Sequence, residues 1–218
     1  IAFGGGRLWS IDQSNGQVLE SNLKNTEHSA VMYHRGDTYQ GTPADIPISI
    51  AWDELRDRLI ILDANGTFFA YRNARNGLPR PLGLPRNMSP NRILKITVYK
   101  NSLLTIDSKG LLSMYKLELN ALRPNVELQL PQSIPNVLSI NLGKSGNPLL
   151  LTSTKFTSLQ LENQIVLEIE PAPPIKSATT LTTDPVHVFA YVVEPEQRRI
   201  LVVDTEHTLI GVYRHPAF

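Results

Sequence analysis

The 218-residue sequence contains no cysteine, and this absence excludes disulfide bridges, thiolate metal sites and a cysteine nucleophile. It also lacks any apolar run near the roughly 20 residues that a membrane-spanning helix needs. Neither charge is in clear excess, because 21 Lys and Arg residues face 20 Asp and Glu residues. We therefore expect no global field that would draw the chain onto nucleic acid or an anionic membrane.

Helical patterning is scarce, whereas proline and glycine are frequent. No long stretch carries apolar side chains at helical spacing, and 16 prolines and 13 glycines interrupt the chain. What recurs instead is a short apolar run that ends in Asp, then a polar turn, then a second apolar or aromatic run. The five copies of this unit end at Asp12, Asp63, Asp107, Ser153 and Asp204.

These marker positions are 51, 44, 46 and 51 residues apart, which is close to the period of a four-stranded propeller blade. Asn-Gly pairs at Asn15-Gly16 and Asn65-Gly66 are typical of tight hairpin turns. We predict an all-β fold, a β-propeller of about five recognisable four-stranded blades, alone or within a ring of roughly six or seven blades. One domain would span residues 1–218, with blades centred on hairpins at 7–20, 58–72, 102–117, 148–162 and 199–214.

Flanking strands complete the predicted blades. Inner strands are predicted at 46–52, 93–99, 137–142 and 186–193, and outer strands at 126–130, 165–169, 30–33 and 81–84. The last repeat stops at Phe218, before an outer strand could form. Either residues 1–3 supply that strand and close a ring of five blades, or further blades lie outside the chain. A start without methionine indicates a piece of something longer.

Two known repeat types are similar to these units. The first copy, GRLWSIDQSNGQVL at 6–19, resembles the propeller repeat of the quinoprotein (PQQ-like) group. Copies two, three and five look more like NHL-type repeats, in which an apolar strand ends in Asp before a polar turn. The resemblance implies a propeller whose families include enzymes, sensors and scaffolds, so it does not select a function. Ser153 departs from the pattern and argues against a shared ligand position.

Catalytic and metal-binding patterns are weak. The repeated Asp residues could form a ring around a channel metal, but Asp at a turn entry ordinarily accepts hydrogen bonds from following N–H groups, and we favour that role. The runs 4–6 and 143–145 lack a complete phosphate-binding loop and are predicted as turns. The five histidines show no two-ligand spacing, and no nucleophile elbow is present. We predict no catalytic residue, no metal site and no cofactor.

One stretch of the chain is strongly basic. Between Asp63 and Asp107 there is no acidic residue but seven basic ones, and prolines make 72–92 an extended excursion. The predicted binding residues here are Arg72, Arg75, Arg80, Arg86 and Arg92. They could form an edge for an acidic protein, a polyanion or lipid headgroups, or a solvated face balanced by acidic residues elsewhere. Nucleic acid is disfavoured, because aromatic side chains for base stacking do not interleave.

A second candidate surface lies in the connection from Asn25 to Asp45. It carries Tyr33, His34, Arg35 and Tyr39. Tyr and Arg are the residue types that anchor interfaces when they are exposed, whereas buried tyrosines would only pack the blades.

Plentiful blade-forming residues and few catalytic motifs lead to a working hypothesis about function. We expect a non-catalytic propeller that acts as a protein-interaction, sensing or scaffold module, within a larger extracytoplasmic or signalling protein, with another protein as partner. The first alternative is a lactonase- or quinoprotein-like enzyme with a divalent ion or cofactor at the central channel. A second is an assembly subunit whose unpaired last blade accepts a strand from a partner.

Overall fold

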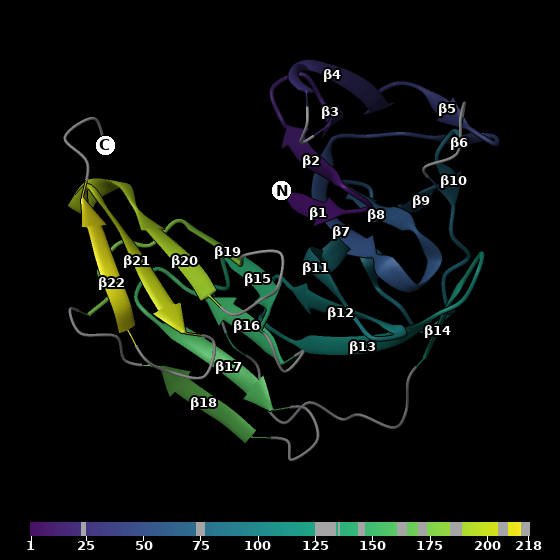
Figure 1. Cartoon of the computed structure of the whole chain (residues 1–218). Helices are drawn as coiled ribbons and strands as arrows, with labels where there is room; N and C mark the ends of the chain where they lie inside the picture. Colours follow the sequence, from purple (N-terminus) through teal and green to yellow (C-terminus); the bar gives the residue numbers. More distant parts are fainter. Residues whose placement is uncertain are drawn as a thin grey trace. The chain divides into compact units, whose positions relative to one another are not determined.

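The computed structural model describes residues 1–22, 25–72, 77–124, 134, 136–143, 147–160, 165–169, 174–183, 189–204 and 209–214. Within them the chain is all-β and forms five four-stranded antiparallel sheets, the blades of a β-propeller (Figure 1). The predicted fold class is confirmed. The helical content of the described residues is three 3-10 turns, η1 (Glu54–Arg56), η2 (Pro90–Arg92) and η3 (Pro195–Gln197). No described helix is long and apolar enough to cross a membrane.

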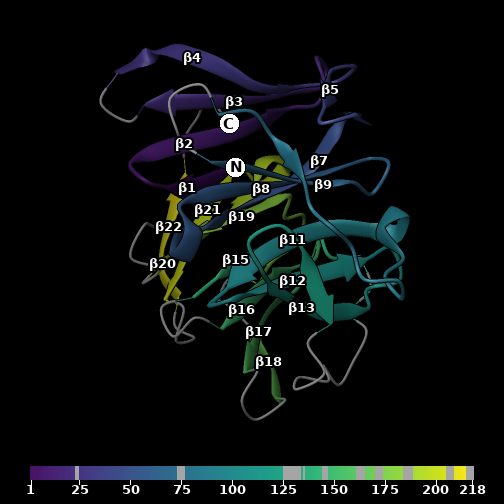
Figure 2. The same ribbon diagram turned by 90° about the vertical axis from the view of Figure 1, so that its right-hand side faces the viewer.

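Each blade is a meander of four strands. Blade 1 comprises β1 (Ala2–Gly4), β2 (Arg7–Asp12), β3 (Gln17–Asn22) and β4 (Asn25–His34), and Figure 2 shows these strands side by side. A small hairpin, β5 (Thr38–Tyr39) and β6 (Thr42–Pro43), follows it. Blade 2 comprises β7 (Pro47–Asp53), β8 (Arg58–Asp63), β9 (Phe68–Arg72) and β10 (Arg80–Pro81).

The remaining blades follow the same order. Blade 3 comprises β11 (Ile93–Tyr99), β12 (Ser102–Asp107), β13 (Leu112–Leu117) and β14 (Leu122–Pro124). Blade 4 comprises β15 (Ser139–Leu142), β16 (Pro148–Leu151), β17 (Phe156–Gln160) and β18 (Ile165–Ile169). Blade 5 comprises β19 (Thr180–Thr183), β20 (Phe189–Glu194), β21 (Arg199–Asp204) and β22 (Leu209–Arg214).

The chain divides into two compact units. Unit 1 comprises residues 1–107 and 114–125 and holds blades 1 and 2 and most of blade 3. Unit 2 comprises residues 108–113 and 126–218 and holds blades 4 and 5. Strand β13 contributes residues to both, because its first two residues belong to unit 2 and the rest to unit 1.

Alternating apolar side chains explain how the blades pack within unit 1. All six residues of β8 are buried, because odd and even positions face different neighbours. Leu59 and Ile61 join a cluster with Trp9 and Val18 of blade 1. Ile60 and Leu62 point the other way and join a cluster with blade 3 residues, including Ile96, Leu103 and Leu117. Blade 2 is therefore the middle layer of unit 1.

Unit 2 has a core of its own. Leu149, Leu151 and Phe156 of blade 4 pack with Leu181, Ala190, Val192, Leu201 and Val203 of blade 5. These side chains are at most 2% exposed, as expected for the contact of two stacked sheets.

The strand order of blade 5 differs from the prediction. In blades 1 to 4 the marked run is the second strand, but 200–204 lies in β21, the third strand of its sheet. The predicted inner strand 186–193 overlaps β20, the second strand, and the first strand is β19, where Leu181 is the single apolar residue. Because one apolar residue makes no alternation, the sequence pattern did not reveal this strand.

The prediction that blade 5 lacks an outer strand of its own is also wrong. Strand β22 occupies that place, and Ala2 and Phe3 pair with Trp9 and Leu8 in blade 1 instead. The predicted outer strand at 126–130 lies outside the described residues, and β14 is the fourth strand of blade 3. The outer strands predicted at 30–33 and 165–169 fall in β4 and β18.

Candidate functional site

Two of the marker Asp residues, Asp12 and Asp63, accept hydrogen bonds from the turns that follow them. Asp12 accepts hydrogen bonds from the Ser14 hydroxyl at 2.6 Å and from the Asn15 side-chain and backbone nitrogens at 2.7 and 3.2 Å. These bonds lower the pKa of Asp12. Asp63 is buried and accepts the Thr67 N–H at 2.8 Å across its hairpin. The described residues contain no group of three or more His, Cys, Asp or Glu side chains placed to hold a metal.

Tyr33 and Tyr39, predicted as binding residues, are buried. Their rings lie 5.6 Å apart, and each contacts Phe69 edge-on at 5.5 and 5.7 Å. The Tyr33 hydroxyl donates to the Asp45 carbonyl at 2.7 Å, and that of Tyr39 donates to the Asp37 carboxylate at 3.0 Å. Burial raises the pKa of Tyr39 to about 12. The tyrosines thus pack the core between blades 1 and 2, whereas the other two predicted binding residues of this connection, His34 and Arg35, are exposed.

The basic excursion lies on the surface of unit 1. Arg72, Arg80, Arg86 and Arg92 are exposed, and Arg75 lies outside the described residues. Among the described residues, none of these four side chains has an ion pair. The structure brings Arg72 and Arg80 together at one pocket, whereas His34, Arg35, Arg86 and Arg92 do not line it. The binding role predicted for these residues stays a prediction.

This pocket, called the arginine pocket below, has a volume of about 520 Å³. Its lining comes from the β5–β6 hairpin, from β8 to β10 of blade 2 and from the turn between β13 and β14 of blade 3. The lining residues are Thr38, Tyr39, Gln40, Arg58, Ala70, Arg72, Gly77, Leu78, Pro79, Arg80, Pro81, Leu82, Leu119 and Asn120. None of them is acidic.

Strand register explains why three arginines meet there. Arg58 on β8 is directly opposite Arg72 on β9, and Arg80 on β10 is directly opposite Ala70, two residues from Arg72. Directly paired residues and residues two apart share a face of a sheet. Arg58, Arg72 and Arg80 therefore lie on the same face of blade 2.

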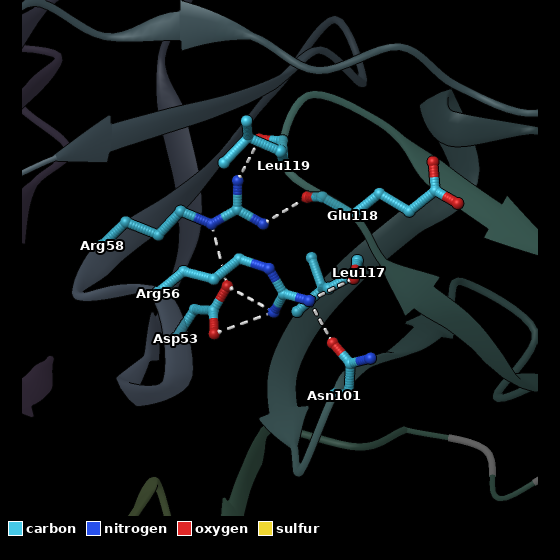
Figure 3. A network of polar contacts seen from close by, with 7 residues as sticks. All are labelled: Asp53, Arg56, Arg58, Asn101, Leu117, Glu118 and Leu119. Carbon is cyan, nitrogen blue, oxygen red and sulfur yellow. Dashed lines mark hydrogen bonds and ion pairs between the residues drawn. The ribbon is translucent and has the colours of Figure 1, made fainter.

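Arg58 anchors the pocket to blade 3 (Figure 3). It is fully buried, and its Nε donates to Asp53 at 2.8 Å. Its terminal nitrogens donate to the carbonyls of Leu119 and Glu118 at 2.5 and 2.7 Å. Arg56 also contacts Asp53, at 3.2 Å, and it donates to the carbonyl of Leu117 at 2.5 Å and to the side chain of Asn101. The turn that carries Leu119 is thus fixed against blade 2.

The charges around Asp53 do not balance. One carboxylate serves both Arg56 and Arg58, and Arg72 lies opposite Arg58. Burial lowers the pKa of Arg58, and repulsion from the charges of Arg56 and Arg72 lowers it further, whereas Asp53 raises it. Like charges directly opposite each other destabilise a strand pair. The pocket is therefore a place where an anion would be stabilised.

Unit 2 repeats this buried pair. Glu194, at the end of β20, accepts from Arg199 Nε at 2.6 Å, and Arg199 also donates to the Pro174 carbonyl at 2.8 Å. Both pairs span a 3-10 turn that is followed by a left-handed residue, Asp57 at φ 48° and Arg198 at φ 50°. Sequence reasoning missed Arg58 and Arg199. The recurring signal was an acidic residue five positions before an Arg that opens an apolar strand.

Comparison with known proteins supports the fold only. No family model matches the sequence, and no curated protein matches it. One similar solved structure is PorZ, described as an essential bacterial surface component of the type-IX secretion system of Porphyromonas gingivalis. It has a TM-score of 0.62 and 11% identity over 99% of this chain and 26% of that chain. The chain thus spans about a quarter of that structure.

A second similar structure is the WD40 β-propeller domain of Doa1. It has a TM-score of 0.59 and 11% identity over 98% of this chain and 67% of that one. At such low identity both likenesses show the propeller fold and leave function to the site itself.

Proposed function

We propose that this chain is a non-catalytic β-propeller module that binds an acidic surface of another protein through the basic excursion of unit 1. The observation that carries the proposal is the set of four exposed arginines without an ion pair among the described residues, in a stretch without acidic residues. Such a surface steers an oppositely charged partner toward the binding site.

Exposed leucines beside these arginines favour a protein over another polyanion. Leu78 and Leu94 are exposed within the same stretch, and Leu84 is partly so. A protein partner covers apolar and charged surface together, whereas nucleic acid or polysaccharide chiefly offers charge to the arginines. We also propose that the module acts as a scaffold or sensor within a larger extracytoplasmic or signalling protein. Its blades would be related to NHL-type or PQQ-like repeats.

The test uses poly-L-glutamate as the simplest acidic polypeptide. We expect the wild type to bind it at about 50 mM NaCl and to lose affinity as salt screens the charges. The R72E/R80E/R86E/R92E variant should bind at least about tenfold more weakly. A matched control reverses four exposed basic residues elsewhere, K109E/K116E/K155E/R198E. It should bind more tightly than the first variant, although both change the net charge from +1 by eight, to −7.

Two results would contradict the proposal. One is equal binding by the two charge-reversed variants, which would mean that only net charge matters. The other is tighter binding of a duplex DNA of about 20 base pairs than of poly-L-glutamate, which would point to nucleic acid instead.

A further inference from the structure

The arginine pocket has a rigid frame. Arg58 holds the carbonyls of Glu118 and Leu119 on one side. On the other side, Gly83 N–H donates to the Asn120 carbonyl at 2.9 Å, and Leu122 N–H donates to the Gly83 carbonyl at 2.8 Å. The turn that carries Leu119 and Asn120 is thus fixed at both ends. A preformed site loses little conformational entropy when a ligand binds.

The polar part of the pocket attracts anions. Arg58 is already satisfied by Asp53 and two carbonyls, so the groups left for a ligand are the exposed guanidiniums of Arg72 and Arg80. The Asp53 carboxylate pairs with Arg56 and Arg58, whereas Arg72 and Arg80 have no ion pair among the described residues. Guanidinium groups bind carboxylates through paired, charge-assisted hydrogen bonds.

The rest of the lining is apolar. Leu78 and Leu119 are 71% and 54% exposed at the pocket, and Pro79, Pro81 and Ala70 also line it. A small inorganic anion at the arginines would leave both leucines in water. A peptide that carries carboxylates next to an aliphatic side chain would cover the arginines and the leucines together.

We infer that the arginine pocket binds a short acidic and hydrophobic peptide segment of the partner protein. Its carboxylates pair with Arg72 and Arg80, and an aliphatic side chain lies against Leu78 and Leu119. This inference rests on the proposed function and adds to it the site and the chemistry of the bound segment.

The experiment measures fluorescence anisotropy with a fluorescein-labelled octapeptide, Gly-Asp-Glu-Leu-Asp-Leu-Glu-Gly. We expect R72E/R80E to weaken its binding by at least about tenfold. The matched control R86E/R92E makes the same charge change in the same excursion outside the pocket, and it should weaken binding by less than about threefold. All four arginines are exposed, so neither variant should lower the thermal unfolding temperature.

A second arm tests the apolar contact. L119S should lower the affinity by about threefold to tenfold without changing the salt dependence, because it removes apolar area and no charge. A peptide with serine in place of both leucines should bind correspondingly more weakly.

Each contrary result has its own meaning. Equal losses in R72E/R80E and R86E/R92E would overturn the pocket and leave the basic excursion as a diffuse acidic-protein surface. Undiminished binding of the serine peptide, with displacement by inorganic phosphate, would reduce the pocket to a simple anion site and overturn the hydrophobic part. Binding of poly-L-glutamate that none of the arginine variants affects would overturn the proposed function itself.

Discussion

Trp52 covers the first strand of the chain so closely that position 4 requires glycine. The indole of Trp52 stacks on that of Trp9, with ring centres 4.5 Å apart and planes 17° from parallel. A Cβ built on Gly4 would overlap the Trp52 ring, and this rigid ring cannot move aside as the end of a flexible side chain could. The run Gly4-Gly5-Gly6 is thus a packing feature followed by a turn in which Gly5 and Gly6 have positive φ.

We therefore expect Gly4→Ala to lower the free energy of unfolding by about 1–3 kcal/mol through overpacking. Gly83→Ala is the control, since a Cβ there would make an ordinary contact with Ala121 at 3.5 Å. Urea denaturation measures both. A Gly4→Ala variant as stable as Gly83→Ala would contradict the contact with Trp52.

At the residue scale, the sequence could predict chemistry that is local. Asp12 takes its partners from Ser14 and Asn15 in the next three residues, and its role as a turn acceptor was foreseeable from this spacing. Tyr33 and Tyr39 could not be placed, because their burial depends on Phe69, which lies 30 or more residues further along the chain. The pairing of Arg72 with Arg58 depends in the same way on strand register.

At the scale of elements, the two acid–arginine turns fix a blade to the segment beside it. Burial raises the pKa of Glu194, but hydrogen bonds from Arg199 and from the N–H groups of Lys176 and Ser177 outweigh it, so the pKa is lowered overall. A carboxyl whose pKa is lower in the folded state stabilises the protein above its unfolded pKa of about 4.3. That contribution is lost as the pH falls through the folded pKa.

Glu194→Gln should therefore lower the free energy of unfolding at pH 7 by about 3–5 kcal/mol, because it leaves the buried Arg199 without a counterion. The difference from wild type should shrink as the pH falls below about 4.3. Exposed Glu196, in the same 3-10 turn, provides the control Glu196→Gln, which should behave as wild type. Urea denaturation between pH 3 and 7 measures the difference, and a gap that stays constant with pH would contradict this account.

Element boundaries show what local patterns can and cannot reveal. The predicted strand at 93–99 coincides with β11, because alternating apolar residues and a following turn define it. The place of 200–204 within blade 5 was not predictable, because the pattern marks a hairpin but does not say which edge of it takes the remaining strands. Long-range strand pairing decides which strand takes which place, and β19 carries too few apolar residues to be recognised from the sequence.

At the scale of the whole molecule, we propose that residues 1–218 form one cooperative domain. Strand β13 belongs partly to each compact unit, so loss of either unit disrupts a strand of the other. Leu201→Ala, in the core of unit 2, should lower a single unfolding temperature by roughly 5–15 °C. Two resolved transitions in calorimetry, of which the substitution moves only one, would contradict a single domain.

The most direct test of the central claim is a residue-resolved NMR titration of the 15N-labelled chain with the acidic and hydrophobic octapeptide. We predict that the guanidinium Nε–H signals of Arg72 and Arg80 and the amide signals of Leu119 and Asn120 shift together as peptide is added. Amides in the core of unit 2, such as that of Leu201, should remain unchanged. Unchanged NMR signals at the arginine pocket, whether or not signals shift elsewhere, would contradict the account of this propeller as a module that binds acidic protein segments.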